Sequence, residues 1–155
     1  MKPTPPGWPR LSVAAFYDDP RAAIDWLCGA FGFAVRILVD GPDGAVMHSE
    51  LEYGEAVIMV AGATPPQGRA SDAWRARLAS PSLAGARVTA NFALYVDDVD
   101  AHCATARAHG AEVVSEPQDV DYGPEHWSDR NYCALDLEGH VWWFMQRLST
   151  GGSPA

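Results

Sequence analysis

Two stretches of the chain alternate between apolar and polar residues, and a turn interrupts each of them. The later stretch, YGPEHWSDRNYCALDLEGHVWWFMQ, has a strand-like run over Arg130 to Leu137, a turn over Leu137 to His140, and a second run over Val141 to Gln146 that is dense in Trp and Phe. The earlier stretch, MHSELEYGEAVIMVA, repeats the pattern around Gly54. Aromatic and β-branched residues on both sides of a turn predict a β-hairpin in each stretch.

Two other segments carry the start and stop signals of a helix. The first begins at Asp18-Asp19-Pro20, which combines an N-cap with Pro at the first helical position. Its apolar residues recur at helical spacing as far as Phe31, and Gly32 fits a left-handed stop. The second helix is predicted from the cap Asp97-Asp98 to His109, with Gly110 as its stop.

The order of these elements is the same in both halves of the chain, which predicts an α+β fold of two tandem β-α-β-β-β modules. Residues 116–129 are predicted to be a long polar loop before the second hairpin, and a short helical piece is expected near 71–78. The predicted division is a flexible N-terminus (1–9), a first module (10–61), a connector (62–86), a second module (87–147) and a flexible tail (148–155).

Composition narrows the functional classes. The net charge is −9, with 20 acidic against 11 basic residues and no basic cluster, so nucleic acid is a poor candidate partner. No apolar run approaches the length of a membrane span, and the Pro-rich N-terminus lacks a signal core, so a cytoplasmic protein without a membrane partner is expected. The three cysteines lack the spacing of a disulfide framework or a zinc site and are interpreted as buried thiols.

Three segments resemble the vicinal oxygen chelate superfamily, which includes glyoxalase I, extradiol dioxygenases and the fosfomycin and bleomycin resistance proteins. They are FYDDPRAAIDWLCGAFGF, the hairpin DGPDG…MHSELEYGEAVIMV, and YGPEHWSDRNYCALDLEGHVWWF. The last looks like the ending of the PhnB-like and bleomycin-resistance-like branch, with Leu137 where that ending usually has Pro. The resemblance implies that the strands of both modules curve into a cup that holds the ligand, and that the protein is a homodimer.

Metal-dependent members of this superfamily carry His, Gln or Glu at two points in each module. Counted from the capping Asp of each helix and the Gly of each hairpin, those positions are Ser12, Ile58, Asn91 and Trp143 here. Ile58 and Trp143 cannot ligate a metal ion, and Ser and Asn offer too little charge. We therefore expect no metal site of the usual kind and no cofactor, and fold resemblance alone does not imply enzymatic activity.

Period-two alternation indicates what the cup offers instead. It places Ser12, Ala14 and Phe16 on one strand face, as it does Asn91, Ala93 and Tyr95, and also Val141, Trp143 and Met145. This wall of aromatic and small apolar residues suits a flat organic ligand. The expected binding residues are Phe16, Tyr95 and Trp143 in the wall, Asn91 or Arg130 for a polar substituent, and Trp127 on a loop that acts as a lid or packs against a partner subunit.

His48, Glu50 and Glu52 share one face of the strand in the first hairpin. His48 and Glu50 are candidates for a polar anchor or for a catalytic acid/base pair, because a His beside carboxylates titrates near neutral pH. A relocated metal site using His48 and Glu50, and a simple solvated sheet face, both stay open.

The leading functional hypothesis is a metal-independent protein that holds an aromatic or amphipathic small molecule in a dimeric cup, as bleomycin resistance proteins do in antibiotic resistance. The alternative is a glyoxalase-like lyase, isomerase or dioxygenase with a displaced metal site or with His48 as general base. A third hypothesis is a module that binds another protein through exposed sheet edges.

Overall fold

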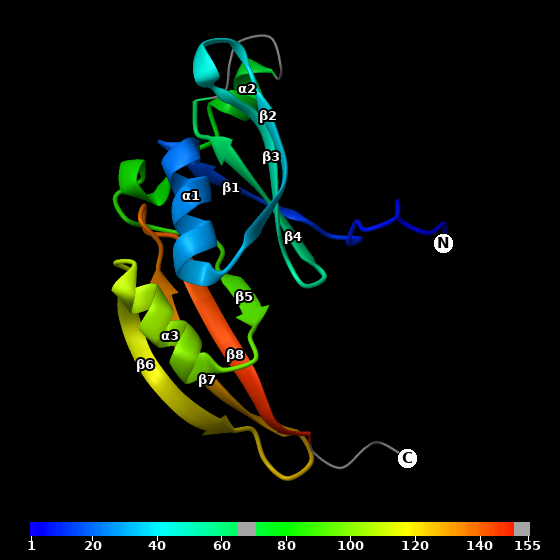
Figure 1. Ribbon diagram of the computed structural model, residues 1–155, viewed down its shortest axis with the longest axis vertical. Helices are drawn as coiled ribbons and strands as arrows, with labels where there is room; N and C mark the ends of the chain where they lie inside the picture. Colours follow the sequence, from blue (N-terminus) through cyan, green and yellow to red (C-terminus); the bar gives the residue numbers. More distant parts are fainter. Residues whose placement is uncertain (65–70, 151–155) are drawn as a thin grey trace. The chain divides into compact units, whose positions relative to one another are not determined.

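The computed structural model describes residues 1–64 and 71–150, and the chain divides into two compact units, Met1–Ala86 and Arg87–Ala155. The described part of each unit contains one four-stranded mixed sheet and one long helix (Figure 1). Both units have the element order β-α-β-β-β. The predicted α+β class with two such modules is therefore confirmed, whereas the cup that the resemblance implies stays a prediction.

In the first unit the sheet order is β1-β4-β3-β2, with β1 parallel to β4 and the other pairs antiparallel. Between β4 and the end of this unit, the described residues form two short helical segments. The elements are β1 (Val13–Tyr17), α1 (Pro20–Phe31), β2 (Ala34–Asp40), η1 (Pro42–Gly44), β3 (Val46–Tyr53), β4 (Ala56–Gly62), α2 (Asp72–Arg75) and η2 (Pro81–Leu83).

In the second unit the sheet order is β5-β8-β7-β6, with β5 parallel to β8 and the other pairs antiparallel. Its elements are β5 (Phe92–Tyr95), α3 (Val99–Ala108), β6 (Glu112–Asp121), β7 (Trp127–Leu135) and β8 (Val141–Thr150). The strand order repeats that of the first unit, as the internal repeat in the sequence predicts.

Both long helices begin at the residues that the sequence indicates, and α1 also ends as predicted, whereas α3 ends at Ala108 with His109 as its C-cap, one residue earlier than predicted. The side chain of Asp19 accepts from the backbone N–H groups of the first turn of α1, and Asp98 accepts from Ala101 N at 2.9 Å. Gly32 ends α1 at a φ of 75°, which is left-handed backbone that favours Gly. The capping Asp residues therefore fix where each helix leaves its first strand.

Each helix covers one face of its own sheet, and strand alternation decides which side chains point at it. On α3, His102 Nδ1 lies 2.6 Å from the Tyr132 hydroxyl, and the His102 and Phe144 ring centroids are 4.3 Å apart. Trp142 is 1% exposed and shares this face with Phe144. Burying one such side chain contributes roughly 1.5–3 kcal/mol. The opposite face of each sheet is called its helix-free face below.

The loop predicted over residues 116–129 is wrong, because most of it is strand. β6 continues to Asp121 and β7 starts at Trp127, and the two strands pair as far as Asp121 opposite Ser128. Within residues 116–121 only Pro117 and Val120 are half-buried and the other four residues are exposed and polar, so this segment carries no period-two hydrophobic pattern. Pro117 is tolerated because β6 is an edge strand with a register shift between Ser115 and Gln118.

The second hairpin is also longer than predicted. β8 runs to Thr150, which pairs with Trp127, so residues 148–150 are strand rather than tail. Residues 151–155 of the predicted tail and 65–70 of the predicted connector lie outside the described residues. Among the residues that are described, no helix is long and apolar enough to cross a membrane.

Candidate functional site

The helix-free face of the second sheet brings together the aromatic residues that the sequence grouped in β5 and β8. Trp142 and Phe144 point at α3, so Trp143 between them points to the other face. Ala93 lies opposite Trp143, and Tyr95 lies opposite Met145. Tyr95 is 49% exposed and Trp143 is half-buried, so both rings belong to a partly open surface.

Arg147 holds two aromatic rings at one end of this face. Its guanidinium carbon lies 5.3 Å from the ring centre of Tyr95 and 5.1 Å from that of Trp127. Its Nε donates to Asp129 Oδ1 at 2.5 Å, its Nη2 donates to the Tyr95 hydroxyl, and that hydroxyl donates to Asp129 Oδ2 at 3.3 Å. The hydrogen bond to Asp129 raises the pKa of Arg147. These contacts fix the orientation of both rings before any ligand arrives.

Sequence reasoning missed Arg147 and Asp129. Arg147 continues the alternation of Trp143 and Met145, and the register pairs it with Asp129. The available signal was an opposite-charge pair, Arg147 and Asp129, with Arg147 two residues beyond Met145 on the same face. The signal was overlooked because the second strand of the hairpin was predicted to end at Gln146. Trp127, expected on a loop, is the first residue of β7.

Asn131 supplies a polar atom on the same face. It lies opposite Met145 and two residues from Asp129 along β7. Its side chain is 6% exposed, and its Oδ1 is buried without a hydrogen-bond partner among the described residues. A buried carbonyl oxygen without a donor is costly, which makes this atom a candidate acceptor for a ligand N–H or O–H group. Asn91, the predicted polar anchor, is exposed immediately before β5.

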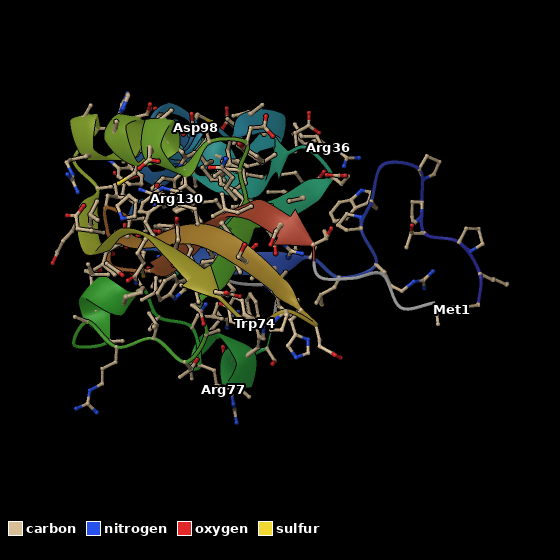
Figure 2. All side chains as sticks on the ribbon, turned by 90° about the horizontal axis from the view of Figure 1, so that it is seen from below. Met1, Arg36, Trp74, Arg77, Asp98 and Arg130 are labelled. Atoms are coloured by element: carbon tan, nitrogen blue, oxygen red, sulfur yellow. The ribbon has the colours of Figure 1, made fainter. Side chains whose placement is uncertain are left out.

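Arg130 lies on the other face of the sheet, and its expected placement beside Trp143 is wrong. Its Nε and Nη2 donate to Asp100 of α3 at 2.7 and 2.9 Å, and its Nη1 donates to Asp119 of β6 at 2.7 Å. Arg130 shares a face with Tyr132 by alternation and therefore points at α3 (Figure 2). These two carboxylates raise the pKa of Arg130, and the guanidinium serves the packing of α3.

In the first unit, Phe16 lies on the helix-free face as expected. Ala15 and Tyr17 on either side of it are buried. The Phe16 ring meets Trp74 of α2 edge-on, with ring centroids 6.0 Å apart. Figure 2 shows Trp74 beside the short helical segment, where it is 43% exposed. The two rings are therefore in contact on this face of the first sheet.

His48 and Glu50 meet on the same helix-free face. His48 Nε2 lies 2.8 Å from Glu50 Oε1, and Glu50 is 3% exposed. The second carboxylate oxygen, Oε2, has no hydrogen-bond partner among the described residues and lies 3.4 Å from Arg36 Nε. The predicted juxtaposition of His48 with Glu50 is confirmed; their role is not decided by it.

The positions of the family's metal ligands do not carry a donor set that fits a divalent ion. Strand register shows that the counterpart of Trp143 in the first unit is Met59, since Met59 lies opposite Ala14 as Trp143 lies opposite Ala93. The prediction that Ile58 occupies this position is wrong, because Ile58 lies opposite Leu51 and faces α1.

The corrected set still lacks a carboxylate or an imidazole. Ser12 donates its hydroxyl to Val57 O at 2.8 Å, Met59 offers a thioether, and a Trp ring cannot ligate. Across residues 1–64 and 71–150, no three His, Cys, Asp or Glu side chains converge on one point. Hard divalent ions require several oxygen or nitrogen donors, so these residues do not fit them.

Comparison with known proteins assigns the family. Residues 11–144 match the family model described as the Glyoxalase/Bleomycin resistance protein/Dioxygenase superfamily. The uncharacterized protein Mb0911c of Mycobacterium bovis is 32% identical over 134 residues, which is 86% of this chain and 80% of that protein. The uncharacterized protein Rv0887c of Mycobacterium tuberculosis is also 32% identical, over 86% of this chain and 72% of its own length.

Solved structures agree with this assignment. TioX from Micromonospora sp. ML1 matches with a TM-score of 0.66 and 30% identity, over 89% of this chain and 98% of that chain. A glyoxalase/bleomycin resistance protein/dioxygenase family enzyme from Burkholderia phytofirmans PsJN matches with a TM-score of 0.59 and 22% identity, over 88% and 97% respectively, and shares the fold. The chain therefore belongs to the glyoxalase/bleomycin resistance protein/dioxygenase superfamily, as the resemblance of its hairpins and helix caps predicts.

Proposed function

We propose that this protein binds an aromatic or amphipathic small molecule against the helix-free face of the second sheet, without a metal ion and as a homodimer. The observation that carries the proposal is the gathering of Tyr95, Trp127 and Trp143 on that face around the buried Asn131 oxygen. Aromatic faces take a flat ligand by stacking, and one acceptor among them fixes its orientation.

The geometry favours a ligand that carries a hydrogen-bond donor. Asn131 Oδ1 can only accept, so a phenol or amide N–H group satisfies it and an ether does not. The Arg147 charge is already paired with Asp129, so an anionic ligand gains little there. A planar compound with one O–H or N–H group is therefore the class that fits.

The test uses 2-naphthol as the probe and naphthalene as the analogue without a donor. Tryptophan fluorescence quenching should saturate with 2-naphthol, and Trp143→Ala and Asn131→Leu should each weaken its binding about tenfold. Arg130→Gln, on the opposite face of the same sheet, is the control and should leave binding unchanged. Equal binding of both compounds, or equal loss in all three variants, would contradict the proposed face.

Metal independence and self-association have their own measurements. Mass spectrometry of protein purified without chelator should find no stoichiometric transition metal, and a stoichiometric one would overturn that part of the proposal. Analytical ultracentrifugation should show a dimer, whose interface we expect to bury more than about 1,200 Å². A concentration-independent monomer would remove the dimer from the proposal.

A second candidate function is acid/base catalysis at His48. It is favoured by the 2.8 Å contact from His48 to the buried Glu50, which can orient the imidazole. The matching reaction class is proton abstraction next to a carbonyl, as in a lyase or an isomerase. Deuterium exchange at the α-carbon of 2-naphthyl methyl ketone, followed by NMR, should then depend on His48 and be lost in His48→Gln; exchange that is equal in both proteins excludes this function.

A further inference from the structure

The first unit contains a hollow of about 610 Å³ that none of the residues discussed for the second sheet lines. It lies between the N-terminal segment and the β3–β4 turn. Its wall is partly apolar and partly acidic, and among its lining residues are Trp8, Pro9, Arg36, Glu52, Glu55 and Val57.

Arg36 connects the N-terminal segment to the first sheet, and its positive charge is paired with the Glu50 carboxylate. Its guanidinium carbon lies 5.5 Å from the Trp8 ring centre, and its Nη1 donates to the carbonyl oxygen of Gly7. Its Nε lies 3.4 Å from Glu50 Oε2. Figure 2 shows Arg36 on the side of the first unit from which the N-terminal segment extends. The Trp8 ring therefore already has a cation over it, which shows that its position suits cation–π contact.

The remaining charge in the hollow is negative. Glu52 and Glu55 are exposed, and within the described residues neither carboxylate has a salt-bridge or hydrogen-bond partner. Behind them, Glu50 is 3% exposed, and its Oε2 lacks a hydrogen bond even though Arg36 is near. Among the lining residues Arg36 carries the one positive charge, and it is already paired with Glu50, so the charges of Glu52 and Glu55 are left uncompensated.

We infer that this hollow is a second binding site, which takes a small organic cation with a primary ammonium group on an apolar body. An ammonium group offers three N–H donors and one positive charge, so it can bind between the Glu52 and Glu55 carboxylates. The apolar body then packs on Val57, Pro9 and the Trp8 ring. A neutral or anionic compound leaves both carboxylates uncompensated and binds less well.

This site is independent of the proposed aromatic face. It lies in the other unit and selects for positive charge, whereas the face around Trp143 selects for a ring with a neutral donor. Failure of one therefore leaves the other standing.

Isothermal titration calorimetry of the full chain with phenethylamine, and with 2-phenylethanol as its uncharged analogue, tests the inference. Phenethylamine should bind saturably and at least tenfold more tightly than 2-phenylethanol. The double variant Glu52→Gln with Glu55→Gln should lose that preference. The control, Glu112→Gln with Glu125→Gln, removes the same charge from exposed positions of the second unit and should keep it.

A second measurement locates the ligand. Phenethylamine should change tryptophan fluorescence in the native chain, and Trp8→Phe should remove that change while keeping an aromatic ring for the contact. The inference is overturned if phenethylamine does not bind saturably, if 2-phenylethanol binds equally well, or if the control variant loses as much affinity as the Glu52 and Glu55 variant. The last result would assign the binding to the net charge of the whole protein.

Discussion

The orientation of β8 leads to a prediction about two neighbouring tryptophans. Trp142 is 1% exposed, stacks on Phe92 at a centroid distance of 4.2 Å, and donates from Nε1 to Asp136 Oδ2 at 3.1 Å. Trp143 is half-buried on the helix-free face. Trp142→Ala should therefore destabilise the fold strongly, and Trp143→Ala should change ligand binding more than stability.

The magnitudes follow from these contacts. Truncating a core Trp costs about 3–5 kcal/mol, which for a chain of this size lowers Tm by about 6–20 °C. Asp136 keeps the backbone N–H donors of Glu138 and His140, at 3.1 and 3.0 Å, so Trp142→Ala does not strand its carboxylate. Trp142→Phe keeps a ring but removes the hydrogen bond to a buried charge, and should cost about 1.5–3 kcal/mol. Trp143→Ala should cost about 1–1.5 kcal/mol.

Urea unfolding followed by far-UV circular dichroism measures all three variants, since the fluorescence signal changes with each Trp removed. The expected order of stability is Trp143→Ala above Trp142→Phe above Trp142→Ala. If Trp143→Ala unfolds the protein as readily as Trp142→Ala, the assignment of strand faces is inverted, and the proposed aromatic face is lost with it.

Three further outcomes are expected. Gly32→Ala, at a φ of 75°, should cost about 1–2 kcal/mol in urea unfolding, whereas Gly62→Ala, whose backbone is not left-handed, should cost less. The hydrogen bond from Arg130 lowers the pKa of Asp100 below 3.8, so its stabilisation is present above that pH and is lost as pH falls through the lowered value; an NMR titration of Arg130→Gln should show the Asp100 pKa rising toward 3.8. Burial raises the pKa of the Cys133 thiol, so alkylation by iodoacetamide at pH 7, followed by mass spectrometry, should be slow until urea unfolds the chain.

The elements with strong local signals could be predicted from the sequence. Asp19 and Asp98 cap the two helices because a carboxylate accepts from the free N–H groups of a first turn, a preference that needs no tertiary information. The hairpin around Gly54 follows from turn chemistry in the same way. The repeat of these signals was enough for the fold class.

The lengths of β6 and β8 could not be predicted, because their ends are held by pairing rather than by burial. Residues from Glu116 to Asp121 are largely exposed or half-buried, so their side chains carry no hydrophobic period. Their backbone pairs with β7, which is a long-range contact that a local pattern does not contain. The network of Arg147 and Asp129 was missed for the same reason.

Site residues were placed on the correct sheet face where the alternation was counted within one strand, and on the wrong face where it was extended from one strand to another. Trp143 and Tyr95 were placed correctly relative to their own neighbours, because period two holds inside a strand. Arg130 was grouped with Trp143 although it lies on a different strand, and no count along the chain relates the two faces. The ion pair of Arg130 with Asp100 of α3 shows that Arg130 lies on the helix face of the sheet.

The misplacement of Ile58 has the same cause and gives the last prediction. Ile58 and Trp143 both lie four residues after a hairpin Gly, but the first residues of their strands face opposite ways. Ala56 pairs with Tyr53, which packs by α1, so Ile58 two residues later also faces α1. Val141 pairs with Leu135 on the helix-free face, so Trp143 lies on that face too. The pairing of β4 with its parallel neighbour β1, and of β8 with β5, gives the correct correspondence between the two units and matches Trp143 with Met59.

Carboxylates installed at the two adjacent positions should therefore behave differently. Ile58→Glu places a charge at a 7% exposed position that faces α1, without a basic partner, and should cost several kcal/mol or prevent folding. Met59→Glu places it on the half-buried helix-free face, where the carboxylate reaches water, and should be tolerated. Urea unfolding of both variants is the measurement. Tolerance of Ile58→Glu together with collapse of Met59→Glu would show that the register, and with it the identification of the family's ligand position, is wrong by one residue.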